Sequence, residues 1–352
     1  MSIFFEKLIQ FQNLKVETKI SYFCNMYKQA FHLSPIQGKK FVVTGGAGFI
    51  GSNIVEYLLT HGAKVRVLDN LATGNLKNLE EFRTNPNFEF LEGDIRNFAD
   101  CAKACDGMDM VCHQAAIGSV PRSIKDPVTS NEVNVNGFVN MLTAAKNAGI
   151  KRFVYASSSS VYGDEPNLPK REERVGNPLS PYAVTKFTNE VYASVFSRCY
   201  NMEIIGLRYF NVFGPKQDPD GEYAAVMPLF IKSLLNDEAP YINGDGEQTR
   251  DFTFVHNAVQ ANIKALTVEN QDAYNQAYNV AFGERFTINQ MYDAIRHYLK
   301  SDIPAIHREP RAGDIRDSLA DISNAKTKLG YMPQYSFEQG LPLTIEYFKT
   351  IL

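Results

Sequence analysis

The sequence predicts an α/β fold in which a Rossmann-type, doubly wound parallel sheet is followed by a smaller C-terminal α/β substrate-binding lobe. Three observations lead to this prediction. Strand-like and helix-like runs alternate through the first half of the chain. The stretch TGGAGFIGSN (44–53) places four glycines between the first strand and the first helix. A carboxylate, Asp69, ends the second predicted strand.

The alternation is carried by short β-rich runs and longer runs with helical spacing. Strands are predicted at residues 39–44, 64–70, 87–94, 108–116, 151–159 and 202–214, and helices at residues 53–62, 128–149 and 182–200. Strands separated by such helices indicate βαβ units with right-handed crossovers, which place helices on both faces of a parallel sheet. Because ligands of these sheets bind at the carboxyl ends of the strands, functional residues are expected there.

The 352-residue chain is long enough for one large domain or two modest ones. We expect three parts: an accessory helical segment at residues 1–38, a dinucleotide-binding domain at 39–213, and a region at 214–352 that is mainly substrate-binding lobe. This lobe is expected to be interleaved with the domain before it, because the pattern becomes irregular after Gly214. Met26 is an alternative start of translation.

Composition and charge argue against several classes of protein. The net charge is −3 with both signs interspersed, so no nucleic-acid partner is expected. No apolar run approaches the ~20 residues that a membrane helix needs, and the N-terminus lacks a signal-peptide pattern, so we expect a cytoplasmic protein without a membrane partner. The five cysteines match no zinc spacing, and no metal site is predicted.

The glycine-rich turn predicts a dinucleotide site. Gly45, Gly48 and Gly51 follow the G-x-x-G-x-x-G spacing, in which glycine lets the backbone turn sharply and approach a pyrophosphate. The next helix points its free N–H groups at the phosphates. Asp69 lies 18 residues beyond Gly51, where a carboxylate accepts hydrogen bonds from the adenosine ribose and repels a 2′-phosphate. The pattern therefore predicts NAD rather than NADP.

Further cofactor contacts are expected at other strand ends. Asp94 and Ile95 follow the third predicted strand and are candidates for contact with adenine. The HQAAIGS stretch follows the fourth strand, and its His113 is expected to be packed or hydrogen-bonded rather than catalytic. The predicted cofactor contacts are Gly45, Gly48, Phe49, Ile50, Gly51, Asp69, Asn70, Thr73, Gly74, Asp94, Ile95, Gln114, Ala115, Ala116, Tyr182, Lys186 and Phe210.

A candidate catalytic pair, Tyr182 and Lys186, lies four residues apart on one face of a predicted helix. The spacing alone is not evidence, because one such pair is expected by chance in this composition. Its position is informative, since the serine run SSSS (157–160) ends the strand before this helix and both should face the nicotinamide. A nearby ammonium and a positive nicotinamide ring both favour a phenolate, which is otherwise formed near pH 10. The arrangement indicates alcohol–ketone chemistry with a nicotinamide cofactor.

A series of motifs gives the chain a family resemblance. TGGAGFIG, LDN, GDI, HQAA, NVNG, SSSSVYG, SPYAVTK and RYFNVFGP occur in this order. From Lys40 onward the chain resembles the extended short-chain dehydrogenase/reductase superfamily. The motifs GSVPRS, GLRYFNVFGP, YINGDGE and SLADIS make it similar to bacterial UDP-N-acetylglucosamine 4-epimerases of the Vi-antigen and O-antigen type, which implies a role in polysaccharide biosynthesis.

The resemblance implies an NAD-dependent isomerase that interconverts UDP-N-acetylglucosamine and UDP-N-acetylgalactosamine through a 4-keto intermediate. Tyr182 is then the base, Lys186 its partner, Ser158 the catalytic serine, and Asn134 a residue that helps to order the active site and a further cofactor contact. A homodimer built from two long helices of each subunit is also implied. The implied substrate contacts are Gly118, Ser119, Ser158, Ser159, Ser160, Tyr182, Asn211, Ala225, Val226, Tyr241, Asn243, Arg250, Arg311, Asp314 and Ser318.

Two small residues bear on the expected substrate. UDP-galactose-type epimerases often carry a tyrosine where Ser318 stands and an asparagine where Ala225 stands, so this chain should leave room for a 2-acetamido group. The alternatives are 4-epimerases of UDP-N-acetylglucosaminuronate or UDP-glucose. A nucleotide-sugar dehydratase is disfavoured because Ser159 and Ser160 replace the acid–base pair it needs. A decarboxylase and a non-catalytic NAD-binding protein complete the alternatives.

Overall fold

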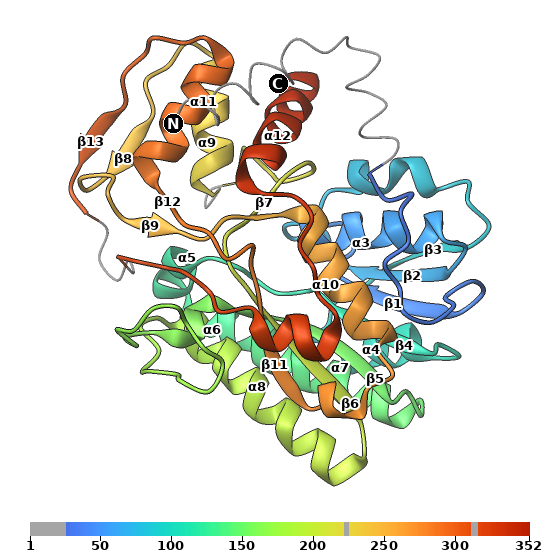
Figure 1. Cartoon of the computed structure of the whole chain (residues 1–352). Coiled ribbons are helices and arrows are strands. Elements are labelled where there is room, and N and C mark those ends of the chain that lie inside the picture. Colours follow the sequence, from blue (N-terminus) through green and yellow to red (C-terminus); the bar gives the residue numbers. More distant parts are fainter. Residues whose placement is uncertain (1–25, 222–224, 311–315) are drawn as a thin grey trace.

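A seven-stranded parallel sheet forms the centre of the molecule (Figure 1). The computed structural model describes residues 26–221, 225–310 and 316–352. The strand order is β11-β6-β5-β4-β1-β2-β3. All strands are parallel, and the order in which the chain adds them reverses between β1 and β4, which is typical of doubly wound sheets. These strands are β1 (Lys40–Thr44), β2 (Lys64–Asp69), β3 (Phe88–Glu92), β4 (Met110–His113), β5 (Arg152–Ser158), β6 (Glu203–Tyr209) and β11 (Gln276–Val280).

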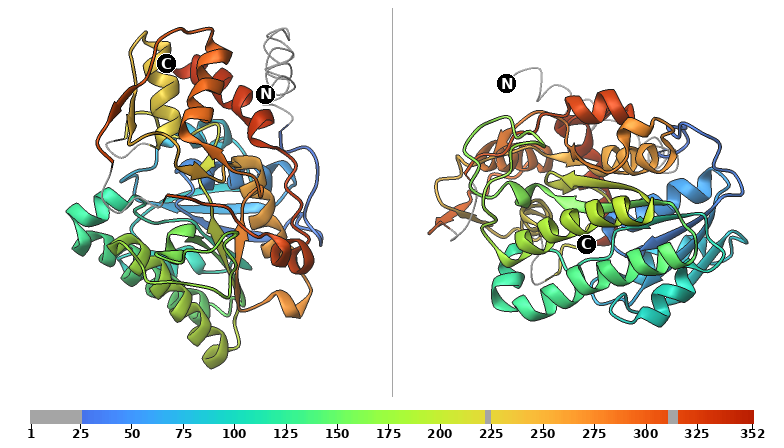
Figure 2. Two further views of the ribbon diagram at one scale, coloured as in Figure 1. Left: turned by 60° about the vertical axis from the view of Figure 1, so that its left-hand side comes forward. Right: turned by 90° about the horizontal axis from the view of Figure 1, so that it is seen from below.

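Helices cover both faces of this sheet (Figure 2). On one face α3 and α10 pack over buried residues such as Phe41, Val43 and Ile205. On the other face α4, α7 and α8 pack over a second cluster that includes Val42 and Phe153. The predicted α/β class and doubly wound sheet are therefore confirmed. These helices are α3 (Phe49–Thr60), α4 (Phe98–Cys105), α7 (Gly137–Asn147), α8 (Pro181–Tyr200) and α10 (Val255–Thr267).

The C-terminal half contributes both a strand and a separate group of elements. β11 pairs with β6 in parallel, Gln276 opposite Ile205, so chain from beyond residue 214 completes the sheet. The other elements form the upper part of Figure 1, where α9, α11 and α12 pack together beside paired β8 and β13. They are β7 (Val212–Phe213), α9 (Val226–Leu235), β8 (Tyr241–Asn243), β9 (Thr249–Arg250), β10 (Thr253–Phe254), β12 (Phe286–Thr287), α11 (Ile288–Leu299), β13 (Ile306–Arg308) and α12 (Phe337–Ile351).

The single helix predicted at 128–149 is interrupted in the structure. It consists of α6 (Pro127–Asn131), a π-helical turn (Glu132–Asn136) and α7. The wider turn places Asn134 inside, where its amide bonds both the N–H (2.8 Å) and the carbonyl (3.0 Å) of Ile117. At the start of α7, a Cβ on Gly137 would lie 2.5 Å from Ile95. A short helix that was not predicted, α5 (Val120–Lys125), precedes this region.

The described part of the N-terminal segment corrects a prediction. Residues 26–38 form no helix but an irregular strap that packs into the main core. Tyr27 donates a hydrogen bond to Asn53 (2.8 Å), and the Phe31 N–H donates to the Tyr57 hydroxyl (2.9 Å), so the strap is fastened to α3. Aromatic stacking, which has no helical period, replaces the expected helix. The rest of the predicted segment, residues 1–25, lies outside the described residues.

No helix in the three described ranges is long and apolar enough to cross a membrane.

Candidate active site

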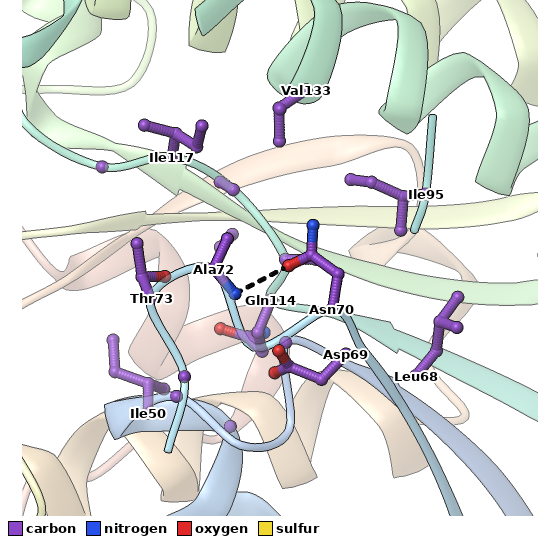
Figure 3. Close-up of a pocket in the computed structure, with 18 of the residues that line it drawn as sticks. Ile50, Leu68, Asp69, Asn70, Ala72, Thr73, Ile95, Gln114, Ile117 and Val133 are labelled. Atoms are coloured by element: carbon purple, nitrogen blue, oxygen red, sulfur yellow. Dashed lines mark hydrogen bonds between the residues drawn. The ribbon is translucent and has the colours of Figure 1, made fainter. Parts of the chain in front are cut away.

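A cavity of about 460 Å³ lies at the carboxyl ends of the central strands (Figure 3). Its walls come from the β1–α3 turn, the ends of β2, β3 and β4, the π-helical turn, and the start of α8. Most predicted cofactor contacts line it, namely Gly45, Gly48, Phe49, Ile50, Gly51, Asp69, Asn70, Thr73, Gly74, Asp94, Ile95, Gln114, Ala115, Ala116, Tyr182 and Lys186. The expectation that functional residues lie at the carboxyl ends of the strands therefore identified residues that share one cavity.

The glycine turn is shaped by close approaches that no side chain could replace. Gly45 has a φ of +66°, and a Cβ there would lie 2.7 Å from the backbone nitrogen of Ala115. A Cβ on Gly51 would lie 2.1 Å from the carbonyl oxygen of Gly45. Helix α3 therefore begins flush against the turn. Gly48 is its N-cap and no side chain caps it, so the first N–H groups of α3 remain available for an anion such as a pyrophosphate.

Asp69 joins the glycine turn to the loop that follows β2. Its two carboxylate oxygens accept hydrogen bonds from the N–H groups of Ala47 (2.9 Å) and Leu71 (2.8 Å). Burial raises the pKa of Asp69, and these two hydrogen bonds oppose the rise. Each oxygen keeps a free lone pair and can accept a hydrogen bond from a ribose hydroxyl group.

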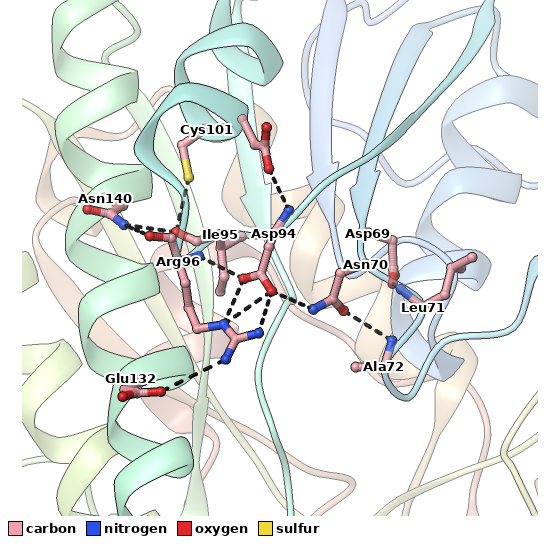
Figure 4. Close-up of polar contacts among 11 residues, drawn as sticks. Asp69, Asn70, Leu71, Ala72, Asp94, Ile95, Arg96, Cys101, Glu132 and Asn140 are labelled. Carbon is pink, nitrogen blue, oxygen red and sulfur yellow. Dashed lines mark hydrogen bonds and ion pairs between the residues drawn. The ribbon is translucent and has the colours of Figure 1, made fainter.

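Asp94 organises the far end of the cavity (Figure 4). Arg96 forms an ion pair with it (2.7 Å), and Asn70 donates a hydrogen bond to the same carboxylate (2.9 Å). The Arg96 hydrogen bonds are the largest cause that lowers the pKa of Asp94, to about 2. Arg96 also lies 3.9 Å from Glu132 at the π-helical turn. Asp94 is therefore an anion that joins the ends of β2 and β3.

Two predicted cofactor contacts do not line the cavity. The Phe210 side chain is fully buried and packs near Tyr162, whereas the preceding residue, Tyr209, lines the cavity. Alternation along β6 explains the difference, because neighbouring residues point to opposite sides. Asn134 is also buried; besides Ile117, it bonds the Thr185 hydroxyl on α8 (3.2 Å), so it supports the cavity wall from behind.

Some cavity residues were missed by sequence reasoning. Arg96 follows a predicted contact directly and could have been included on position. Thr129 and Val133 are one turn apart on α6 and the π-helical turn, and only helical spacing would have signalled them. The missed residues are Leu68, Ala72, Gly93, Arg96, Ile117, Thr129, Val133, Ala156, Ser157 and Tyr209.

The candidate catalytic pair lines the cavity from the first turns of α8. Lys186 is 3% exposed, donates a hydrogen bond to the Ala156 carbonyl (2.8 Å), and lies 5.9 Å from the centre of the Tyr182 ring. Burial lowers the pKa of Lys186 to about 8. Burial also raises the pKa of Tyr182, while a hydrogen bond with Ser158 opposes the rise. The side chains alone therefore favour a neutral phenol, and a further positive charge is needed to form phenolate.

The serine run ends β5 beside this pair. Ser158 caps the following turn by accepting a hydrogen bond from the Ser160 N–H (3.1 Å). Among the described residues, the buried Ser160 hydroxyl has no hydrogen-bond partner. His113 is packed, as predicted: it bonds the Thr44 hydroxyl (2.8 Å) and lies against Phe138. Burial, then the charge of Lys186, lowers its pKa to about 3, so it stays neutral.

The predicted substrate contacts are divided between the cavity and the C-terminal lobe. Gly118 lines the cavity, and Ser119 caps α5 with a φ of +114°. Asn211 has a φ of +31° and donates a hydrogen bond to the Asp251 carbonyl (3.2 Å). Ala225 is the N-cap of α9, which Val226 begins, and no side chain caps this helix.

The remaining substrate-side residues lie on short strands or beside them. On β8, Tyr241 is 54% exposed and Asn243 accepts a hydrogen bond from Arg308 (2.6 Å). On β9, the Arg250 side chain donates a hydrogen bond to the carbonyl of Thr249 (2.8 Å). The Thr249 carbonyl also accepts a hydrogen bond from the Ser318 N–H (3.2 Å). Arg311 and Asp314 lie outside the described residues.

Known proteins resemble this chain in sequence and fold. The sequence profile of the NAD-dependent epimerase/dehydratase family matches residues 41–281. The chain belongs to this family. NAD is the family's cofactor, and the uncapped α3 start and the Asp69 carboxylate fit its pyrophosphate and ribose. This family is one of the extended short-chain dehydrogenases/reductases, which the motifs resemble.

UDP-sugar 4-epimerases are among the relatives of this family member. The UDP-glucose 4-epimerase of Mycolicibacterium smegmatis is 38% identical over 88% of this chain and 98% of its own length. The structure of UDP-N-acetylglucosamine 4-epimerase from Methanobrevibacter ruminantium M1, in complex with UDP-N-acetylmuramic acid, has a TM-score of 0.85 and 41% identity, covering 90% of this chain and all of that one. UDP-glucose 4-epimerase from Thermotoga maritima, with UDP-glucose, has a TM-score of 0.83 and 35% identity, covering 89% and 99%.

Proposed function

We propose that the protein interconverts UDP-N-acetylglucosamine and UDP-N-acetylgalactosamine by inverting C4 of the sugar. The observation that carries this proposal is the meeting of Tyr182 and Lys186 with an NAD-type glycine turn around one cavity, with the Ser158 hydroxyl hydrogen-bonded to Tyr182. The UDP-N-acetylglucosamine 4-epimerase from M. ruminantium, at 41% identity, supports the acetylated substrate. Small Ser318 and Ala225 on the substrate side support it as well.

Bound NAD would supply the hydride chemistry at C4 of the sugar, which is reversible removal of a hydride and its return to the opposite face. Tyr182 accepts the proton of the 4-hydroxyl group and gives it back after the 4-keto sugar has turned. Ser158 donates a hydrogen bond to the reacting oxygen, and Lys186 stabilises the phenolate. Since burial raises the pKa of Tyr182, proton acceptance depends on the positive charge of Lys186 and of the oxidised cofactor.

The two halves of the chain then divide the binding. We propose that the NAD-binding half runs from residue 39 to 213, with the α3 start at the pyrophosphate, Asp69 at the ribose and Asp94 near adenine. Gln114, Ala115 and Ala116 would line the dinucleotide. The region from residue 214 onward would mainly hold the UDP-sugar.

In the proposed UDP-sugar site, polar residues bind the diphosphate and nucleotide, and small residues surround the sugar. A guanidinium group suits a diphosphate, which supports Arg250 and Arg311 in that role. The uncapped N-terminus of α9 is a further anion-binding feature. Small residues beside the sugar leave it free to turn over. The proposed diphosphate and nucleotide contacts are Asn211, Val226, Tyr241, Asn243, Arg250, Arg311 and Asp314, and the proposed sugar contacts are Gly118, Ser119, Ser159, Ser160, Ala225 and Ser318.

Turnover on four UDP-sugars tests this proposal. The protein as purified is incubated separately with UDP-N-acetylglucosamine, UDP-N-acetylgalactosamine, UDP-glucose and UDP-galactose, and the products are separated by chromatography. We expect 4-epimers without net NADH, formed faster from the acetylated pair. A 4-keto-6-deoxy product, or no product from any of the four, would contradict the proposal.

A UDP-glucose 4-epimerase is the second candidate. The M. smegmatis and T. maritima relatives carry that name, at 38% and 35% identity. The same four incubations distinguish the two candidates, because this one requires the non-acetylated pair to react faster. UDP-N-acetylglucosaminuronate is added as a fifth incubation for the uronic acid alternative.

We also propose a homodimer formed through α7 and α8. Apolar side chains lie exposed along α8, with Val184 and Val191 50% exposed and Phe187 39% exposed. They recur at helical spacing on one stripe, which is the pattern of a covered face. Light scattering of the purified protein is expected to give twice the 39.6 kDa chain mass. A monomer at micromolar concentration would contradict it.

A further inference from the structure

A buried ion pair lies directly behind the candidate catalytic helix. Glu190 is on α8, one helical turn beyond Lys186 and two beyond Tyr182, so the three side chains leave the same face of the helix. Arg208 of β6 meets Glu190 with two parallel hydrogen bonds, Nε to Oε1 at 2.9 Å and Nη2 to Oε2 at 2.8 Å. The arginine and glutamate side chains are 6% and 12% exposed. This is the bidentate geometry that fixes both groups in orientation.

The ion pair reaches the strand that carries the serine run. The hydroxyl group of Ser157 donates a hydrogen bond of 2.6 Å to Oε1 of Glu190. One turn earlier on α8, Lys186 donates to the carbonyl of Ala156. Two successive turns of the helix are therefore bonded to two successive residues of β5. The next residue of that strand is Ser158.

Arg208 also holds the turn that follows the serine run. It lies opposite Ser157 in the β5–β6 register, and its Nη1 donates to the Tyr162 hydroxyl (3.0 Å) and to the Glu172 carbonyl (3.1 Å). Tyr162 in turn donates to Asn279 of β11 (2.6 Å). The serine run is thus bonded on both sides to a single buried network.

We propose that Ser157, Glu190 and Arg208 are positioning residues that hold the Ser158 hydroxyl at hydrogen-bond distance from Tyr182. This inference rests on the proposed function, in which these two hydroxyl groups act on the same sugar oxygen. Stability alone does not require the ion pair, because apolar side chains of similar volume often replace a buried pair without loss. Position does matter, since a displacement of about 1 Å between reacting groups costs on the order of 100-fold in rate.

The same two strands carry a matched control pair at their opposite ends. Arg152 begins β5 and Glu203 begins β6; they are register partners, and Nη2 of Arg152 lies 2.8 Å from Oε2 of Glu203. The Arg152 side chain is 10% exposed. This pair resembles Glu190–Arg208 in chemistry and in the burial of its arginine, although the Glu203 side chain is 34% exposed; it lies at the amino ends of the strands, away from the cavity.

The first test removes the hydrogen bond between Ser157 and Glu190 and leaves the Glu190–Arg208 ion pair in place. Ser157→Ala is expected to lower kcat roughly 10- to 100-fold with an unchanged KM, and to lower Tm only slightly, because one buried hydrogen bond is lost while the ion pair stays. Its kinetics are measured with whichever UDP-sugar the wild-type protein turns over. A kcat within twofold of wild type would overturn the proposal.

The second test separates positioning from stability. Glu190→Met leaves the Arg208 guanidinium buried without its partner, so both Tm and kcat should fall. The double variant Glu190→Met/Arg208→Met removes that uncompensated charge; its Tm is expected to recover while kcat stays low. The control Glu203→Met should lower Tm but leave kcat within twofold. Recovery of kcat together with Tm, or an equal loss of kcat in the control, would overturn the proposal.

A third readout does not depend on turnover. Crystal structures of wild type and Ser157→Ala give the distance between the hydroxyl oxygens of Ser158 and Tyr182. We expect hydrogen-bond distance in the wild type and a longer separation in the variant; equal distances would refute the positioning role. If the wild type converts no UDP-sugar, the proposed function fails, and this distance still decides the inference.

Discussion

The two halves of the molecule build their parts of the site in different ways. In the sheet half, residues that line the cavity follow strands: Gly45 comes after β1, Asp69 ends β2 and Gln114 comes after β4. In the C-terminal half, the candidate residues lie at separate points on loops and two- or three-residue strands, such as Arg250 on β9 and Ser318 beyond β13. Regular alternation brings strand ends to one edge, whereas the lobe depends on individual hydrogen bonds between distant segments.

One buried carboxyl group makes several of those hydrogen bonds. Asp251 follows Arg250, is fully buried, and accepts hydrogen bonds from the N–H groups of Ala320 (3.1 Å), Phe282 (3.3 Å) and Gly283 (3.3 Å). It thereby connects the β9–β10 turn with the end of β11 and with the segment after Ser318. Burial raises its pKa to about 7. Position along the sequence gave no sign of this role.

The largest expected effect is on the chemistry in the sheet half. Tyr182→Phe removes the hydroxyl group proposed to accept the proton, and kcat should fall about 1,000-fold. Bound NAD should be unchanged, because its proposed contacts lie mainly on β1 to β4. Product formation and the NAD released on denaturation are measured together. Tyr200→Phe, at the exposed end of the same helix, is the control and should keep wild-type kcat; equal losses in both variants would contradict the assignment.

The next effect concerns stability: the free energy contributed by Asp251 in the C-terminal half and by Asp94 in the sheet half changes with pH in opposite directions. The pKa of Asp251 is raised in the folded state, so its stabilising contribution is complete below about pH 4 and is lost as the pH rises to about 7. The shift of about 3 pH units corresponds to roughly 4 kcal/mol as an upper bound. The pKa of Asp94 is lowered, so its contribution is lost as the pH falls from about 4 to 2.

Urea unfolding between pH 4 and 8 measures the contribution of Asp251. Asp251→Asn should flatten the fall in the free energy of unfolding toward pH 7, although it also loses one hydrogen-bond acceptor. Asp94→Asn is the matched control and should leave that slope unchanged. An Asp251→Asn protein with the wild-type slope would show that Asp251 ionises normally.

A smaller effect concerns the size of the sugar pocket in the C-terminal half. Ser318→Tyr should lower the rate with UDP-N-acetylglucosamine roughly 10- to 100-fold, because the larger side chain would occupy the space of the acetamido group. The rate with UDP-glucose should be spared. Both rates are measured on the same preparation. Equal loss of both would refute the role of Ser318 as a gatekeeper.

The smallest effect concerns cofactor choice in the sheet half. Asp69→Asn removes the charge that should repel a 2′-phosphate, so the preference for NAD over NADP should narrow about 10-fold, equivalent to about 1.4 kcal/mol. Asp109→Asn is the control, since Asp109 accepts a hydrogen bond from the Lys40 N–H (2.8 Å) at the opposite end of β1. Dissociation constants of both cofactors are measured by calorimetry. An unchanged preference in Asp69→Asn would contradict the proposed ribose contact.

The sequence predicted the sheet and the cavity walls well because both follow from periodicity. Strands of period two and helices after glycines identify the six strands from β1 to β6 and the residues at their ends. Prediction failed where a single interaction decides. The π-helical turn that interrupts the helix expected at 128–149 was not predicted, and Tyr209 at the end of β6 lines the cavity whereas Phe210 does not.

Other features had no local signal at all. Residues 26–38 read as part of a helix, but their aromatic side chains pack on α3 and α10. The Glu190–Arg208 pair and Asp251 unite residues 18 or more positions apart, which only the tertiary fold brings together. On the substrate side, short strands carry too little pattern to be recognised.

The central claim is that Tyr182 takes the proton of the sugar's 4-hydroxyl group while the hydride of C4 passes to bound NAD and later returns to the same carbon. The most direct test uses UDP-N-acetylglucosamine labelled with deuterium at C4, followed by mass spectrometry and NMR of the product. The account predicts UDP-N-acetylgalactosamine with deuterium still at C4 and no accumulation of NADH. Loss of the deuterium to water, or epimerisation that persists at the wild-type rate in Tyr182→Phe, would contradict it.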